Sequence, residues 1–483
     1  MTHDPHRSCR AKSRHLFAKA PRLRSGPTAL VALAALLAHP AAAQTIAITN
    51  GTVALGDGSA PIPNGTVVIR DGRVVAAGRG VAVPAGIRTL DATGKWVTPG
   101  IIAGFSRLGL VDVDAVAGSN DQSAEGPFSA ALDVAPAINP NAAPVAINRA
   151  EGVTRAIVAP ATSKNIFAGQ GALIDTAADG QPVTRARLFQ FVELGEEGAE
   201  QAGGSRAAAH VLLRNALREA RQISGGGRTI RDVAGREPGD PRNEPVVANP
   251  NETRSYEARR NQDVLLTRFD AQALVPVLQG RQILVIHAHR ASDLRQVIAL
   301  RREFPALRLV IVGADEGWTV AQELAASGIP VIASALSSLP ASFESLAATH
   351  SNVGRMRAAG VRVAIGTIND DEQRMAFRAR WYAGNLVGLG KVPGATGLSW
   401  GEALASITSA PAEAMGLGGE VGSLAPGRRG DVVIWSGDPL DNMSAAETVV
   451  IDGVEQPLDN RQTKLRDRYR TLERGALPEA YRR

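Results

Sequence analysis

The stretch that decides the fold is "KWVTPGIIAGFSRLGL", residues 95–110. It contains a polar turn, a Pro-Gly pair and a short apolar strand that ends at Phe105-Ser106-Arg107. Before it, residues 44–98 consist of short strands with turn signals. Two of these signals are Asn50-Gly51 and Asp71-Gly72. The second lies between two valine-rich runs and is typical of a β-hairpin. From about residue 99 onward, buried apolar strands alternate with helical stretches.

Eight apolar runs follow this change, separated by amphipathic stretches such as 205–222 and 291–304. Continuous apolar strands that alternate with helices predict a parallel sheet covered by helices, and eight of them favour a closed barrel. Residues 224–262 are rich in Gly, Arg, Pro and Asn, which predicts a mobile insertion. The expected strands are 100–105, 153–160, 171–175, 187–194, 282–289, 307–313, 329–334 and 361–367.

The strand-and-turn style returns after about residue 418, in "GSLAPGRRGDVVIWSGDPLD" at 422–441. We therefore expect an α/β protein with a distorted (β/α)8, TIM-like barrel over residues 99–417. A small β-sandwich domain is expected beside it, assembled from both ends of the chain. Its two halves are residues 44–98 and residues 418–483, the latter including a tail.

The first 43 residues resemble an export signal. Seven basic residues and one acid precede the apolar run "TALVALAALLA" at 28–38, and Ala41-Ala42-Ala43 offers a cleavage site before Gln44. This order predicts a cleavable signal peptide and a periplasmic or secreted protein. The apolar run is shorter than the ~20 residues of a spanning helix, so no membrane insertion is expected after cleavage. An uncleaved anchor is the alternative.

Removing residues 1–43 changes the charge of the chain. Lys+Arg falls from 53 to 46 and Asp+Glu from 47 to 46, so the net charge falls from +6 to 0. The basic character therefore belongs to the signal, and no nucleic-acid partner is indicated. The single cysteine, Cys9, lies in the same segment, so no disulfide is expected. The expected partner is a small-molecule ligand or substrate, and a homo-oligomer is compatible with the sequence.

Three segments in this order resemble the amidohydrolase superfamily, and its imidazolonepropionase-like branch in particular. They are "GTVVIRDGRVVAAG" (65–78), "LDATGKWVTPGII" (90–102) and "GSLAPGRRGDVVIWSGDPL" (422–440), and "ILVIHAHR" (283–290) followed by "LVIVGADEGW" (309–318) strengthens the likeness. The resemblance implies a metal-dependent hydrolase of non-peptide carbon–nitrogen bonds. Its active site would lie at the carboxyl ends of the barrel strands.

Members of that family hold one or two divalent metals, usually zinc, which activate a water. The resemblance places the first pair of ligands, normally His-x-His, at Phe105 and Arg107, which do not bind cations. It places Phe191 near the fourth-strand ligand, with Glu193 as the nearest carboxylate. His287 matches the fifth-strand ligand, Gly313 replaces the sixth-strand histidine, and Ile368 or Asn369 replaces the final aspartate. This pattern predicts a degenerate metal site.

Only four histidines remain after residue 43, at positions 210, 287, 289 and 350. His287 and His289 are the best remaining metal ligands, because one-residue spacing on a strand places both on one face. Two readings stay open: one divalent ion such as zinc held by this pair with a carboxylate, or two structural histidines. We expect no tightly bound ion, because catalytic zinc requires three protein ligands. His350 is a possible third ligand, and His210 is expected to be structural.

Carboxylates follow two of the expected strands, at Asp315-Glu316 and at Asp370-Asp371. Glu316, Asp370 and Asp371 are candidate general bases near His287, the alternative being a role at helix N-termini. Arg107 stays protonated and is expected to take the place of the lost metal, by pairing with one of these acids or with an anionic ligand. Two functions follow: a hydrolase with an incomplete site, or a non-catalytic barrel that binds a small ligand or partner protein.

Overall fold

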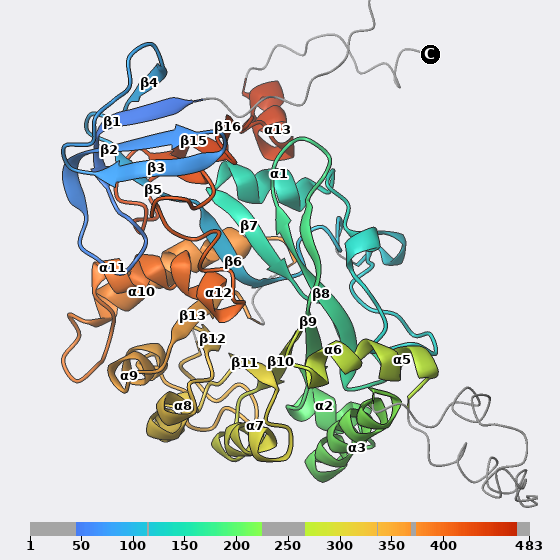
Figure 1. The fold of residues 1–483 in the computed structure, drawn as a ribbon. Helices are drawn as coiled ribbons and strands as arrows, with labels where there is room; N and C mark the ends of the chain where they lie inside the picture. Colours follow the sequence, from blue (N-terminus) through green and yellow to red (C-terminus); the bar gives the residue numbers. More distant parts are fainter. Residues whose placement is uncertain (1–44, 114, 225–265, 336, 369–372, 471–483) are drawn as a thin grey trace, which may run out of the picture. The chain divides into compact units, whose positions relative to one another are not determined.

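The computed structural model describes residues 45–113, 115–224, 266–335, 337–368 and 373–470. The predicted signal peptide (1–43), almost all of the predicted insertion (224–262), and the acids Asp370 and Asp371 therefore lie outside the described residues. Within them, two sheets organise the chain from Ala41 onward (Figure 1). One sheet is built from strands near both chain ends, and the other forms a nearly closed barrel.

The strands and helices alternate through the barrel as its apolar pattern predicts. The strands are β1 (Ile46–Val53), β2 (Ile62–Arg70), β3 (Arg73–Gly78), β4 (Arg88–Asp91), β5 (Trp96–Pro99), β6 (Ile101–Ser106), β7 (Val153–Val158), β8 (Phe167–Asp175), β9 (Val183–Glu193), β10 (Ile283–Ala288), β11 (Arg308–Gly313), β12 (Val331–Ser334), β13 (Val363–Gly366), β14 (Val432–Trp435), β15 (Ala446–Ile451) and β16 (Val454–Glu455). The α-helices are α1 (Ala143–Ala150), α2 (Glu196–Gln201), α3 (Arg206–Ser224), α5 (Arg268–Ala273), α6 (Val275–Leu278), α7 (Ala291–Glu303), α8 (Ala321–Ser327), α9 (Asn352–Ala358), α10 (Ala379–Leu389), α11 (Trp400–Ala405), α12 (Ser409–Ala414) and α13 (Arg461–Tyr469).

The first sheet joins the two ends of the chain. Its strand order is β16-β15-β14-β5-β1-β2-β3, with β4 paired to β1. The junction is the antiparallel pairing of β14 with β5, in which Val433 lies opposite Thr98. Buried side chains from both ends, such as Val97 and Ile434, share one apolar cluster. The expectation that strands from both chain ends assemble beside the barrel is confirmed, and they form one sheet.

Two Asx-Gly pairs in this sheet have different roles. Asp71 and Gly72 both have positive φ, 50° and 73°, and connect β2 to β3 in a tight hairpin as expected. Asn50 also has positive φ, 64°, but it lies inside β1, where the pairing with β2 shifts register. The Asn50-Gly51 signal therefore marks a β-bulge within β1 and not a turn between strands, because a residue with left-handed backbone conformation occurs in bulges as well as in hairpin turns.

The barrel contains all eight strands expected from the sequence, in the order β6 to β13. They differ from the expected parallel sheet at one strand, because β8 runs antiparallel to both β7 and β9. The remaining neighbours within the sheet are parallel. At the closing edge β6 lies close to β13, and a Cβ on Gly104 would stand 2.8 Å from the carbonyl oxygen of Ile365.

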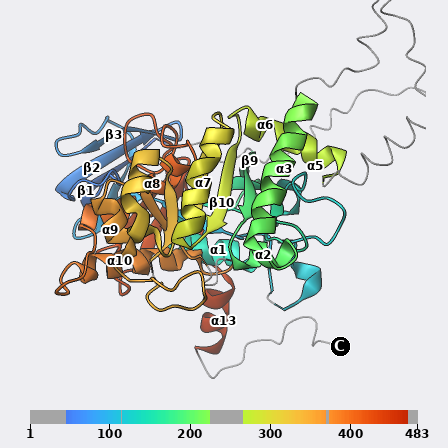
Figure 2. The same ribbon diagram turned by 90° about the horizontal axis from the view of Figure 1, so that it is seen from below.

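Helices surround the barrel strands, and apolar side chains fill the interior. Figures 1 and 2 show α3, α7, α8 and α9 outside strands β9 to β13. Inside, alternate residues such as Phe189, Phe191, Ile283 and Val285 form a cluster of buried side chains. None of the described helices combines the length and the apolar composition that a bilayer crossing requires.

A buried ionic network connects the barrel to the composite sheet. Arg155 on β7 is fully buried, and its guanidinium donates to Asp431 Oδ2 at 2.7 Å and Oδ1 at 3.1 Å. The same side chain lies 2.9 Å from Asp452 Oδ1 and 3.5 Å from Asp175 Oδ2. Asp431 and Asp452 border β14 and β15, so these contacts join β7 of the barrel to the carboxyl-terminal strands.

Candidate functional site

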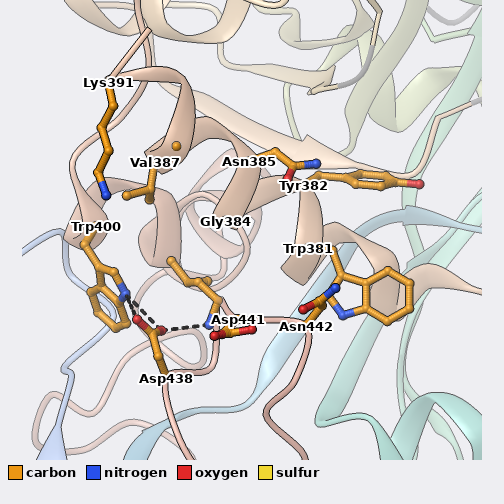
Figure 3. A pocket seen from close by; sticks show the side chains of 12 residues that line it. Trp381, Tyr382, Gly384, Asn385, Val387, Lys391, Trp400, Asp438, Asp441 and Asn442 are labelled. Atoms are coloured by element: carbon orange, nitrogen blue, oxygen red, sulfur yellow. Dashed lines mark hydrogen bonds between the residues drawn. The ribbon is translucent and has the colours of Figure 1, made fainter.

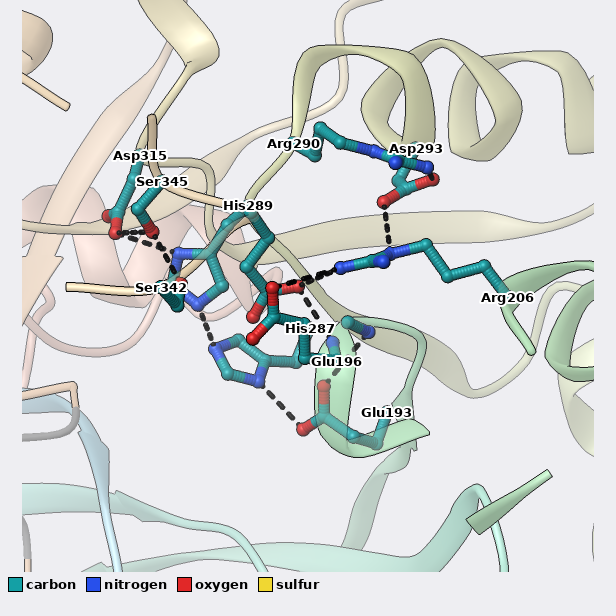
Figure 4. A network of polar contacts seen from close by, with 12 residues as sticks. Glu193, Glu196, Arg206, His287, His289, Arg290, Asp293, Asp315, Ser342 and Ser345 are labelled. Atoms are coloured by element: carbon teal, nitrogen blue, oxygen red, sulfur yellow. Dashed lines mark hydrogen bonds and ion pairs between the residues drawn. The ribbon is translucent and has the colours of Figure 1, made fainter. Parts of the chain in front are cut away.

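Four titratable side chains converge at the carboxyl ends of β9, β10 and β11 (Figure 4). Glu193 is the last residue of β9, and His287 lies on β10. His289 follows β10 directly, and Asp315 follows β11. Alternation places Glu193 and His287 on the same inner face as the apolar residues deeper in the barrel. We call these four residues the histidine relay.

The relay is a continuous line of short polar contacts. Glu193 Oε2 lies 2.7 Å from His287 Nδ1, and His287 Nε2 lies 2.8 Å from His289 Nε2. His289 Nδ1 then lies 3.0 Å from Asp315 Oδ2, at an angle outside that of an aligned hydrogen bond. Ser345 Oγ donates to the same Asp315 oxygen at 2.9 Å. The two histidines predicted as a pair do meet, and each is held by its own carboxylate.

The arrangement determines how many protons the two imidazoles hold. Each Nδ1 faces a carboxylate oxygen, which accepts but does not donate when ionised. The 2.8 Å contact between the two Nε2 atoms requires a proton on one of them, because two unprotonated nitrogens would direct their lone pairs at each other. With an N–H on each Nδ1 and one proton between the Nε2 atoms, the pair would carry one positive charge between the two carboxylates.

The pKa values of the relay follow from this charge distribution. Burial alone would lower the pKa of His287, but the adjacent Glu193 carboxylate outweighs burial and raises it above the usual value. Burial would raise the pKa of Asp315, but His289 and the Ser345 hydroxyl outweigh it and lower that pKa. Both shifts favour the charged form of the group.

We expect Glu193→Gln to lower the pKa of His287, because the substitution removes the charge that offsets burial. A histidine whose folded pKa is raised stabilises the fold fully below its unfolded pKa, about 6.5. That stability is lost as the pH rises through the folded value. NMR titration of the imidazole signals measures the pKa, and unfolding at several pH values measures the linked stability. Glu303→Gln, at the exposed last residue of α7, is the control, and an unchanged His287 pKa in Glu193→Gln would contradict the assignment.

Gly313 makes the close approach of the histidines possible. It has a φ of +97°, and a Cβ there would lie 2.8 Å from His289 Cε1 and 3.1 Å from His287 Cδ2. Ala314 is also left-handed, with a φ of 52°, and is buried. Two successive left-handed residues turn the chain so that Asp315 meets His289. Left-handed non-glycine residues cost free energy and persist where surrounding structure enforces them.

A second layer of charges surrounds the relay (Figure 4). Arg206 Nη2 lies 3.5 Å from Glu196 Oε1 and 3.3 Å from Glu344 Oε2, and Arg206 Nε lies 3.3 Å from Asp293 Oδ2. Glu344 Oε2 also accepts a hydrogen bond from the backbone N–H of Glu196 at 2.7 Å. Arg206 therefore ties α2, α3 and α7 to the loop that carries Ser345.

The residues at the end of β6 pack instead of binding a cation. Phe105 is 4% exposed, and its ring lies 5.6 Å from that of Phe191, which in turn stacks 6.5 Å from His287. Arg107 lies over the Phe105 ring at 5.6 Å and donates to the Ala159 carbonyl at 3.4 Å. The structure thus gives Phe105 and Phe191 an apolar role directly beneath His287.

The acidic residues predicted for the site do not share one set of contacts. Asp315 Oδ2 lies 3.0 Å from His289 Nδ1 and accepts from Ser345 Oγ at 2.9 Å, so its neighbours are an imidazole and a hydroxyl and not Arg107. Glu316 accepts from the Ala291 N–H at 2.9 Å and the Ala347 N–H at 3.1 Å, which agrees with its alternative role at a helix N-terminus. The predicted pairing of Arg107 with Asp370 or Asp371 remains a prediction.

The other two histidines lie apart from the relay. His350 is exposed, in the segment before α9. His210 lies on α3, and its Nε2 is 4.0 Å from Asp293 Oδ1 in the second layer. His210 therefore has the structural position that its alanine-rich helix indicates.

The relay in its present geometry does not fit a catalytic zinc ion. Each Nδ1 contacts a carboxylate, as in metal-binding histidines, and both Nε2 atoms point to a common position. Tetrahedral bonds of about 2.0–2.1 Å would hold two nitrogens roughly 3.4 Å apart, more than the 2.8 Å observed. The described residues include no group of three or more His, Cys, Asp or Glu side chains placed to bind one ion. We therefore derive no step through a metal.

Sequence reasoning did not identify Ser345, Glu344 or Arg206 as part of this site. Glu193 was recognised only as the nearest carboxylate to a missing ligand. Its signal was the alternation of Phe189, Phe191 and Glu193, which predicts that the glutamate faces inward with the two rings. Ser345 and Glu344 lie in a loop whose sequence contains no periodic signal.

Comparison with known proteins agrees with this architecture. Residues 277–455 match the model of the Amidohydrolase family. A crystal structure of an amidohydrolase from Thermotoga maritima MSB8 shares the fold, with a TM-score of 0.69 and 23% identity over 86% of this chain and 100% of that chain.

Two curated proteins match shorter stretches. The amidohydrolase tasK of Hapsidospora irregularis is 43% identical over 60 residues, 12% of this chain and 6% of that protein. The imidazolonepropionase of Acidiphilium cryptum (strain JF-5) is 38% identical over 94 residues, 20% of this chain and 22% of that protein. The chain thus matches less than a quarter of the length of each relative. Residues 277–455 of this chain therefore resemble the Amidohydrolase family, and the Thermotoga maritima structure shows that the chain shares its fold.

Proposed function

We propose that this chain is an exported hydrolase of the amidohydrolase superfamily that acts on non-peptide carbon–nitrogen bonds. The histidine relay is its proton-transfer group, and it holds no tightly bound metal. The observation that carries the proposal is the direct His287–His289 contact between two buried carboxylates. It lies at the carboxyl ends of the barrel strands, where barrel enzymes place their chemistry.

The relay supplies both a base and an acid. When the proton shared by the two Nε2 atoms passes to bulk solvent, each ring keeps its Nδ1–H toward a carboxylate and exposes an Nε2 lone pair. One Nε2 then accepts a proton from water as the water oxygen attacks the carbonyl carbon. The same proton passes to the leaving nitrogen when the carbon–nitrogen bond breaks, so the relay returns to the form with two free Nε2 lone pairs and is ready for the next turnover.

Glu193 and Asp315 act as positioning residues in this scheme. Each fixes one ring through Nδ1 and stabilises the imidazolium that forms during transfer. The Glu193–Gly195 contact, in which Glu193 Oε1 accepts from the Gly195 N–H at 3.2 Å, holds the carboxylate in turn. His287 has 11% of its side chain exposed, more than His289 with 5%, so it is the ring closer to a substrate.

A second candidate function rests on a different observation. Phe105 and Phe191 pack together, with Phe191 against His287, at positions where the resemblance places a first-strand and a fourth-strand metal ligand. A barrel packed in this way also suits a non-catalytic protein that binds a small ligand at the same mouth. The hydrolase and the binding protein are distinguished by whether the chain hydrolyses any substrate.

The test uses the purified chain beginning at Gln44 and a panel of lactams, cyclic imides, hydantoins and N-acyl amines. At least one compound is expected to be hydrolysed, with kcat/KM at least about a hundredfold lower in His287→Gln, as for loss of a general acid–base group. His350→Gln, in an exposed position, is the matched control. Chelator treatment should leave turnover unchanged, and elemental analysis should find less than one equivalent of zinc.

Each alternative has its own outcome. Stoichiometric zinc in the wild type that is lost in His287→Gln would overturn the metal-free scheme. A panel with no turnover, but with a compound that raises the melting temperature of the wild type, would favour the binding protein. Export is tested separately by N-terminal sequencing of the mature protein, which should begin at or near Gln44; an intact Met1 would refute it.

A further inference from the structure

A cavity of about 590 Å³ lies apart from the histidine relay, between α10, α11 and the loop that follows β14 (Figure 3). Its volume is in the range of about 300–1,000 Å³ typical of small-molecule sites. It also lies where the barrel helices meet a loop of the composite sheet, a common position for such sites. The side chains that carry the argument below are Val387, Lys391, Trp400, Asp438, Leu440 and Asp441.

One wall of the cavity is a fixed indole. Trp400 Nε1 donates to both carboxylate oxygens of Asp438, each at 3.0 Å, and the Trp400 ring packs 4.9 Å from that of Trp96. Asp438 Oδ1 also accepts from the Leu440 N–H at 2.9 Å. The indole is therefore held in place, and with Val387 and Leu440 it gives the cavity an apolar surface. The Asp438 carboxylate is thus already hydrogen-bonded to the residues of this wall.

Two opposite charges remain in the same cavity. Lys391 and Asp441 lie on different sides of it in Figure 3. Within the described part of the chain, no carboxylate lies at ion-pair distance from Lys391. Asp441 Oδ1 accepts from the Met443 N–H at 2.9 Å, and no described Lys, Arg or His side chain forms an ion pair with this carboxylate. The cavity thus presents one exposed cation, Lys391, and two carboxylates: Asp438, which is bound to the indole, and the exposed Asp441, whose backbone carbonyl accepts from Arg380 Nη1 at 2.9 Å.

We propose that this cavity binds a free α-amino acid with a large apolar side chain. The carboxylate of the ligand would pair with Lys391, its ammonium would pair with Asp441, and its side chain would pack on Trp400. A zwitterion is the small ligand that satisfies both charges at once. This inference is independent of the hydrolytic function, because it uses none of the relay residues.

The experiment is isothermal titration calorimetry of the purified chain with L-phenylalanine and two analogues that each lack one charge. N-acetyl-L-phenylalanine lacks the ammonium, and L-phenylalaninamide lacks the carboxylate. We expect L-phenylalanine to bind, and each analogue to bind at least about tenfold more weakly, as for loss of a hydrogen bond to a charged group.

Crossed variants identify which group meets which charge. Lys391→Met should weaken L-phenylalanine about tenfold or more but leave L-phenylalaninamide unchanged. Asp441→Asn should weaken L-phenylalanine similarly but leave N-acetyl-L-phenylalanine unchanged. Lys464→Met, in the exposed helix α13, is the matched control. The thermal melting of all three variants confirms that they fold.

Three results would overturn the proposal. The first is the absence of binding at millimolar L-phenylalanine. The second is equal affinity for the zwitterion and both analogues, which would show that only the ring is recognised. The third is binding of a neutral sugar such as maltose in place of L-phenylalanine, which would assign the indole wall to a carbohydrate.

Discussion

Deletion of residues 418–483 is expected to abolish cooperative unfolding. The deletion removes β14, which pairs with β5 in the interior of the composite sheet. It also removes buried apolar side chains such as Val432, Ile434 and Trp435. Each buried side chain of this size contributes about 1.5–3 kcal/mol. Together these losses amount to a large fraction of the free energy of unfolding of a typical protein, which is roughly 5–15 kcal/mol.

A shorter deletion provides the matched control. Removal of residues 460–483 takes away α13, which contains no buried residue, and leaves every strand in place. Thermal unfolding followed by circular dichroism should give a native-like transition for this variant. The longer deletion should give aggregation or a broad, non-cooperative change. A native-like melt after deletion of 418–483 would refute the composite sheet as a stabilising unit.

Substitution Arg155→Met is expected to destabilise the fold by about 3–5 kcal/mol, because it leaves buried carboxylates without their counter-charge. Arg155 is fully buried, and it contacts Asp431, Asp452 and Asp175. Chemical denaturation measures the loss. Arg295→Met is the control, because the exposed pair of Arg295 with Glu323 should contribute little. Equal stability of Arg155→Met and wild type would show that the network does not hold the two sheets together.

Asp175 and Asp431, which both contact Arg155, are expected to contribute differently to the stability of the fold. Burial raises the pKa of Asp175 to about 6, even though Arg155 lowers it. Because this value exceeds the unfolded pKa of about 3.9, ionisation of Asp175 removes stability as the pH rises from about 4 to 6. Asp175→Asn should therefore retain wild-type stability at pH 7.5. Asp431→Asn should lose stability there, because Asp431 receives the two-pronged contact from Arg155.

Apolar runs in the sequence were enough to locate every barrel strand, because strands buried on both faces are continuously apolar. The same runs contain no information about strand direction, which is why the reversal of β8 was not predicted. The composite sheet could be predicted because the pattern of short strands separated by turns at residues 44–98 occurs again after residue 418. The Asn50-Gly51 signal was ambiguous, since one left-handed residue serves a bulge as well as a hairpin.

The site was predictable only in part. The one-residue spacing of His287 and His289 predicts that they share a face, and the structure brings their Nε2 atoms together. Their carboxylate partners come from elsewhere in the chain, and Glu193 is separated from His287 by 94 residues. Contacts over such distances depend on how strands are ordered around the barrel. Composition and periodicity do not specify that order.

The pairing of β5 with β14 also determines when the chain can finish folding during its synthesis. The hydrogen bond from Trp435 Nε1 to Thr98 Oγ1 joins residues 337 positions apart. At about 5–20 residues per second, the ribosome needs roughly 17–70 seconds to supply the second partner after the first. During that interval the open edge of β5 has no neighbour and offers a binding surface for chaperones. Synonymous codons that slow translation within the barrel would lengthen this exposure without changing a single residue of the protein.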